Sequence, residues 1–107
     1  MEQNQSENGS NSRSVANKSA IDEPSNLYFL HHSDSPGLVL VSQQLTGENY
    51  ASWSRAMTIA LTVKNKLSFI NGSMKKPDAS DSDLVNSWIR NNTMVISWIL
   101  NSISKDI

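Results

Sequence analysis

Polar residues dominate the start of the chain, and apolar residues recur regularly only from about residue 27 onward. Residues 1–25 are mainly Asn, Ser, Gln and Glu, interrupted by Val15, Ala16, Ala20 and Ile21. So few apolar groups cannot offset the conformational entropy that is lost when a backbone becomes ordered. We therefore expect a disordered polar tail over residues 1–25.

The first apolar stretches are short. Residues 27–30 form a small cluster, and a turn rich in Asp, Ser, Pro and Gly leads to residues 37–42, which read Gly-Leu-Val-Leu-Val-Ser. A β-branched run between Pro-Gly and two glutamines is typical of a strand that is covered on both faces. We expect one short β-strand here, paired either with residues 27–30 or with a sheet edge on another molecule.

An amphipathic helix is predicted next, ending near residue 65 or 66. One face recurs at the i, i+3, i+4 spacing of a helix, with Thr46 or Asn49 as the N-cap. This face consists of Tyr50, Trp53, Met57, Ala60, Leu61 and Lys64, opposite a face of Ser, Arg and Thr. The large indole of Trp53 is expected to anchor the core.

A second, long helix is predicted after a connection that contains Asn-Gly at 71–72 and Pro77. Any of residues 80–83 can cap it, and apolar residues then follow helical spacing as far as Ile103. Residues 94–100 are almost all apolar, so this stretch needs cover on more than one side. We infer that either a further helix has been cut away or a second copy supplies the missing wall.

These patterns define the residues on which the fold and its contacts should depend. The expected core and motif residues are Leu45, Gly47, Asn49, Tyr50, Trp53, Met57, Leu61, Leu67, Phe69, Ile70, Gly72, Trp88, Val95, Trp98 and Ile99. The candidates for self-association are Met94, Trp98 and Leu100.

Composition and charge exclude several classes of function. The formal net charge is -1 and Cys is absent, which argues against a phosphate-binding surface, thiolate metal sites and disulfides. No phosphate loop or catalytic motif occurs, and His31 and His32 are read as loop residues because no partner ligands stand near them. We expect no catalytic residue, metal, cofactor or small-molecule ligand. Without a signal sequence or membrane span, a cytoplasmic or nuclear location is expected.

The same residues resemble a known family. Residues 36–41, the stretch Leu-Thr-Gly-Glu-Asn-Tyr at 45–50 and Trp-Ser-Arg-Ala-Met at 53–57 resemble the N-terminal domain of plant copia-type LTR retrotransposon Gag. The resemblance continues through residues 64–73 into Trp88 and the stretch from Ser97 to Ile103.

The resemblance implies a mainly α, small capsid-like helical domain and a non-enzymatic role in self-assembly. It places a copia-like N-terminal domain at 26–73, and a linker with the first, truncated part of the following Gag helical segment at 74–107. Partners would be other Gag copies, and element RNA would be bound only through downstream regions absent here. The alternative is a solitary host protein derived from the element, which acts as an interaction module or interferes with intact Gag.

Overall fold

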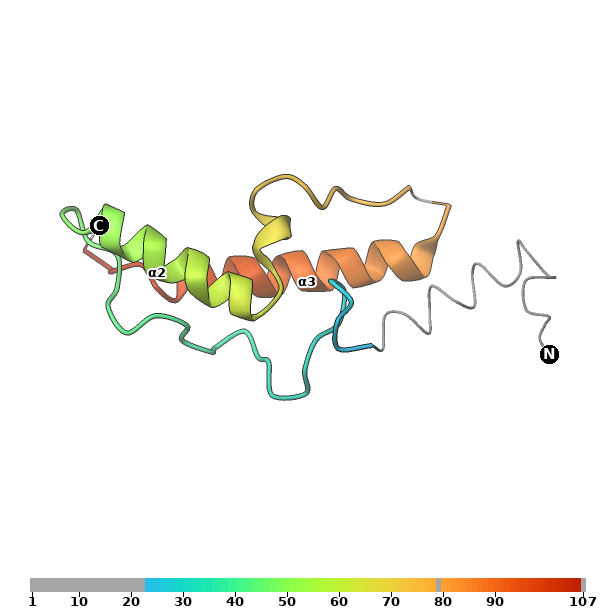
Figure 1. Cartoon of the computed structure of the whole chain (residues 1–107), viewed down its shortest axis with the longest axis horizontal. Helices are drawn as coiled ribbons and strands as arrows, with labels where there is room; N and C mark the ends of the chain where they lie inside the picture. The colour runs from blue at the N-terminus through green and yellow to red at the C-terminus, as the bar shows by residue number, and fades with distance from the viewer. Residues whose placement is uncertain (1–22, 79, 107) are drawn as a thin grey trace.

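The described part of the chain consists of two helices joined by a short helical turn. The computed structural model describes residues 23–78 and 80–106, so nearly all of the tail predicted for residues 1–25 lies outside the described part. Helix α2 spans Tyr50–Val63, the 3-10 turn η2 spans Leu67–Phe69, and helix α3 spans Ser82–Leu100. The two helices lie side by side and run in opposite directions (Figure 1). The predicted mainly helical class is confirmed.

Helix α2 begins and ends through backbone geometry rather than through a side-chain cap. Asn49 stands at the N-cap position without capping, because its side chain is engaged by Thr46 and by the carbonyl of Gln44. At the other end Asn65 has a φ of 61°, and the amide of Lys66 donates to the Leu61 carbonyl at 2.8 Å. This is the Schellman arrangement, and it ends the helix a little before the predicted residue 65 or 66.

Helix α3 begins at a side-chain cap. The Asp81 carboxylate accepts a hydrogen bond from the amide of Leu84 at 3.1 Å, which selects one of the four predicted caps. Asp83 places a further negative charge in the first turn, where it interacts favourably with the helix dipole.

The core lies where the two helices meet the loops around them. Its buried apolar members are Val41, Trp53, Met57, Leu61, Phe69, Val95 and Trp98. They come from both sides of residue 73, the position at which the sequence suggests a division, so the two parts share one core. No helix among the described residues is long and apolar enough to cross a membrane.

The strand expected at residues 37–42 does not form. This segment has no regular secondary structure, and residues 27–30 are bonded by side chains instead of by a neighbouring strand. The β pairing that occurs within the described residues is an isolated parallel bridge between Leu45 and Ile103. There the amide of Leu45 donates to the Ser102 carbonyl at 2.7 Å, and the bridge joins the start of α2 to the end of α3.

Candidate interaction surface

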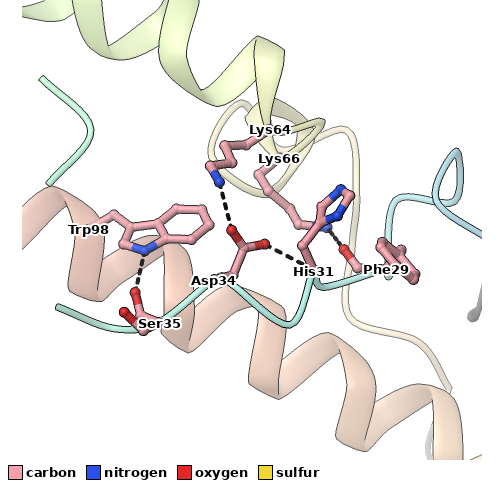
Figure 2. Close-up of polar contacts among 7 residues, drawn as sticks. All are labelled: Phe29, His31, Asp34, Ser35, Lys64, Lys66 and Trp98. Atoms are coloured by element: carbon pink, nitrogen blue, oxygen red, sulfur yellow. Dashed lines mark hydrogen bonds and ion pairs between the residues drawn. The ribbon is translucent and has the colours of Figure 1, made fainter. Parts of the chain in front are cut away.

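Residues 27–36, here called the N-terminal segment, cover part of α3. The indole nitrogen of Trp98 donates to the Ser35 carbonyl at 2.7 Å (Figure 2), and the Asn101 amide group donates to the Pro36 carbonyl at 2.6 Å. Asn91 donates to the Tyr28 carbonyl at 2.9 Å. Trp98 is fully buried as a result. The N-terminal segment therefore provides part of the cover over α3 that the sequence analysis expected from a missing helix or a second copy.

A buried lysine fastens the same segment to the end of α2. The Lys66 ammonium donates to the carbonyls of Leu27, at 2.7 Å, and Phe29, and the residue is 1% exposed (Figure 2). Burial lowers the pKa of Lys66 to about 8, and the nearby carboxylate of Asp34 opposes this shift. Buried ammonium groups are tolerated when carbonyl oxygens replace the lost water.

Asp34 connects the N-terminal segment to α2. Its carboxylate forms an ion pair with Lys64 at 2.7 Å and accepts a hydrogen bond from the His31 backbone amide at 3.1 Å (Figure 2). The Asp34 side chain is 2% exposed, so this pair is shielded from solvent more than an ordinary surface pair. The Lys64 ammonium also lies 5.7 Å from the centre of the Trp98 ring. These polar contacts hold the segment over the core.

Sequence reasoning did not identify Asp34, Lys66 or Asn91 as contact residues. For Lys64 a signal was present, because the lysine falls on the apolar face of the predicted helix, where a solvated charge is unexpected. Asn91 and Lys66 give no comparable signal, since the carbonyls that they meet belong to residues far away in the sequence.

The structure separates the expected core and motif residues into three groups. Six are buried: Trp53, Met57, Leu61, Phe69, Val95 and Trp98. Five are partly exposed: Leu45, Asn49, Leu67, Trp88 and Ile99. Four are exposed: Gly47, Tyr50, Ile70 and Gly72.

The exposed residues have local reasons for their position. Tyr50 stands in the first turn of α2, beyond the end of the core, and is 66% exposed, contrary to the expectation that it would line the buried face. Ile70 follows η2 and is also largely exposed. Gly72 adopts a φ of 85°, so it serves the turn rather than the core.

The three candidates for self-association also differ in position. Leu100 is exposed at the end of α3, Met94 is partly buried against the core, and Trp98 is enclosed by the chain itself. Trp98 therefore cannot contact a second molecule in this fold, because the N-terminal segment and Lys64 already cover its ring.

Two surface regions are apolar and are not covered by any of the described residues. The first, here called the α3 stripe, consists of Ile89, Ile96 and Leu100, whose spacing of seven and four residues places them on one helical face. The second, here called the α2 groove, is a hollow of about 820 Å³ between residues 38–43 and one side of α2. These regions are where a macromolecular partner could bury apolar surface.

The described residues hold no group of three or more His, Cys, Asp or Glu side chains that could bind a metal ion. His31 and His32 are both exposed, and the His31 ring packs edge-on against Phe29 with the ring centres 4.8 Å apart.

The comparison with protein families agrees with the resemblance noted in the sequence. A family described as the Gag-polypeptide of LTR copia-type matches residues 31–78. The match covers the end of the N-terminal segment, α2 and η2, and it stops before α3. Neither the search of curated proteins nor the search of solved structures found a match. Residues 31–78 of this chain are therefore similar to the copia-type Gag family, in agreement with the resemblance noted in the sequence.

Proposed function

We propose that the chain is a non-enzymatic structural module of a copia-type Gag polyprotein and that it associates with further copies of itself. The Gag-related role is supported by the family match at residues 31–78. Self-association is supported by the distribution of apolar side chains over the two helices, and above all by the α3 stripe.

The α3 stripe carries the proposal because α3 has two apolar faces. Asn91, Val95 and Trp98 face the inside of the fold and are buried. Ile89, Ile96 and Leu100 face away from that side and remain 42%, 47% and 62% exposed. A helix that is packed on one side needs only one apolar face, so the second face indicates a further contact.

The strength of such a contact is bounded by its size. Complete burial of one large aliphatic side chain contributes roughly 1.5–3 kcal/mol, and these three are already partly buried. After the cost of association, one stripe supports only weak binding between two copies. Weak contacts are sufficient to hold an assembly of many copies together, because many such contacts act at once.

Sedimentation of the whole chain over a range of concentrations tests self-association. We expect concentration-dependent association that Leu100→Lys weakens about tenfold or more, because a buried unpaired ammonium opposes the contact. Thr58→Lys is the matched control, since Thr58 is an exposed residue of α2 away from both apolar regions. A chain that stays folded and monomeric at every concentration contradicts the proposal.

A further inference from the structure

Residues 38–43 combine the sequence of a strand with an unpaired backbone. From Val39 to Gln43 no backbone amide or carbonyl group has a hydrogen-bond partner within the described structure. Both ends of the stretch are held, because the amide of Leu38 donates to the Ser35 carbonyl at 3.1 Å and Leu45 pairs with Ser102. The unpaired backbone is thus fixed in place beside α2 instead of belonging to a free loop.

Val41 is a buried residue within this unpaired backbone. The residue is only 7% exposed, and neither its amide nor its carbonyl group has a hydrogen-bond partner among the described residues. Buried backbone groups almost always have a hydrogen-bond partner, because an unpaired group loses its hydration without compensation. The irregular segment around Val41 therefore has backbone groups that an added strand could pair with.

The α2 groove lies beside this backbone and can receive the side chains of such a neighbour. Val39, Ile59 and Val63 line it with exposed fractions of 63%, 59% and 81%. An extended segment that adds to residues 38–43 would gain main-chain hydrogen bonds and also bury apolar side chains, which is the usual mode of strand addition.

The charges around the groove favour an uncharged occupant. No charged residue occurs from Ser35 to Gly47. The one charged residue that lines the groove is Lys64, whose ammonium is paired with Asp34. An acidic or basic peptide therefore gains no attraction here, and two copies of this surface do not repel each other.

We propose that residues 38–43 pair in antiparallel orientation with the same residues of a second copy, across a twofold axis at the α2 groove. Leu-Val-Leu-Val is an uncharged sequence of high strand propensity, so the segment is suited to be its own partner. The inference rests on the proposed self-association and names the surface and geometry of one contact.

This contact is distinct from the α3 stripe, and the distinction has a structural consequence. A twofold contact closes on itself and gives only a dimer, whereas two different contacts on one chain allow assembly to continue. Stable dimers bury about 800 Å² per partner, which a six-residue pairing beside three exposed apolar side chains does not reach. The pairing is therefore weak on its own.

Hydrogen exchange measured at low and high protein concentration tests the pairing directly. The amides of residues 39–43 exchange rapidly in the monomer, and they should become at least about tenfold slower when copies associate. Protection that is equal at all concentrations would assign the groove to residues 1–22 of the same chain and overturn the proposal. Amides that remain unprotected in the associated state would overturn it as well.

Two substitutions at Val39 provide independent readouts. Val39→Lys places like charges at the paired edge and should weaken association about tenfold or more, whereas Thr58→Lys should leave it unchanged. Val39→Cys should give a covalent dimer with a short bifunctional maleimide, whereas Thr58→Cys should not. The absence of cysteine from the chain makes this crosslink specific for the introduced position.

The outcomes separate this inference from the proposed function. If the wild-type chain associates but Val39→Lys behaves like Thr58→Lys and Val39→Cys does not crosslink, the strand pairing is wrong while self-association stands. If the wild-type chain does not associate, both fail. Circular dichroism checks that Val39→Lys remains helical, as its 63% exposure leads us to expect.

Discussion

The N-terminal segment (residues 27–36) and the linker between the helices (residues 71–81) are both irregular, and both are rich in turn-forming residues. They differ in how they are held. The N-terminal segment receives hydrogen bonds from Lys66, Asn91 and Trp98, and its Asp34 pairs with Lys64. These residues belong to α3 and to the turn that follows α2, so the segment is fastened to two parts of the fold.

The linker is held mostly by hydrogen bonds between residues close together in the sequence. Asn71 accepts hydrogen bonds from Ser73, and the Asp78 carboxylate accepts one from the amide of Ser80. Besides the cap that Asp81 forms on α3, the linker accepts a hydrogen bond from the Trp88 indole at the Met74 carbonyl, at 3.3 Å. The two irregular segments therefore differ in their coupling to the core.

The comparison shows how a segment without regular secondary structure can be ordered. The backbone carbonyl groups of such a segment need hydrogen-bond donors, which a neighbouring strand would supply in a sheet. Here long side chains from the helices supply them instead. Since these side chains are themselves buried, removing one of them affects both the segment and the core.

The largest expected effect concerns the two tryptophans that contact these segments. We expect Trp98→Ala to lower the free energy of unfolding by about 3–5 kcal/mol, because it leaves a cavity and an unpaired Ser35 carbonyl. Trp88→Ala should cost less, about 1–3 kcal/mol, because Trp88 is partly exposed and packs at the edge of the core beside Phe69. Urea denaturation measures both values.

Tryptophan fluorescence is not comparable among these variants, because each substitution removes one of the indoles that fluoresce. Circular dichroism at the helix band follows unfolding independently of the indoles. Equal costs for Trp98→Ala and Trp88→Ala would show that the two segments are coupled to the core to the same extent, against the comparison drawn above.

A smaller effect is expected from pH, through Lys66. Its pKa in the fold is about 8, below the usual lysine value of about 10.4, so the unfolded chain binds more protons between these two values. The free energy of unfolding should therefore rise with pH in this range. We expect a gain of about 2 kcal/mol between pH 7.5 and 9.5, measured by urea denaturation.

Lys66→Met is the matched control because it keeps an unbranched side chain without a titratable group. The rise between pH 7.5 and 9.5 should disappear in this variant, whatever its stability at neutral pH. Tyr28 acts in the opposite direction at higher pH, because burial, together with the charge of Asp81, raises its pKa above the usual value. A wild-type chain whose stability does not rise up to pH 9.5 contradicts the description of Lys66.

The smallest effect is expected from lengthening the linker. Two residues inserted after Lys75 should cost less than about 0.5 kcal/mol, because loop-closure entropy grows slowly with length. The same insertion after Ser33 should cost several times more, since it shifts Asp34 and Ser35 away from Lys64 and Trp98. Thermal unfolding of the two variants measures both costs, and similar losses of stability would contradict the difference between the two segments.

Much of the helical fold could be predicted from the sequence. The spacing of Trp53, Met57 and Leu61 identifies the buried face of α2, and the Asp and Ser residues before α3 announce its start. The strand at 37–42 was wrong, because strand propensity describes a segment that fits a sheet and does not provide a partner. The chain has no neighbouring strand at this place within its described part.

The candidate surface was only partly predictable. The apolar run at 94–100 predicts a helix that needs cover on more than one side, and the structure covers Val95 and Trp98 while Ile96 and Leu100 stay exposed. The sequence did not show that the N-terminal segment covers Trp98, because the two lie 63 positions apart along the chain.

The sequence by itself determined which residues are helical and which helical face is apolar, since both follow from contacts between residues a few positions apart. Only the tertiary structure decided which apolar face is covered and which remains free. Which face is covered depends on hydrogen bonds from Lys66, Asn91 and Trp98 to carbonyl groups far away in the sequence. The local spacing of apolar residues does not reveal such long-range hydrogen bonds. The resemblance to copia-type Gag was accessible from the sequence, whereas the exposed α3 stripe and the unpaired backbone of residues 39–43 became visible only in the folded chain.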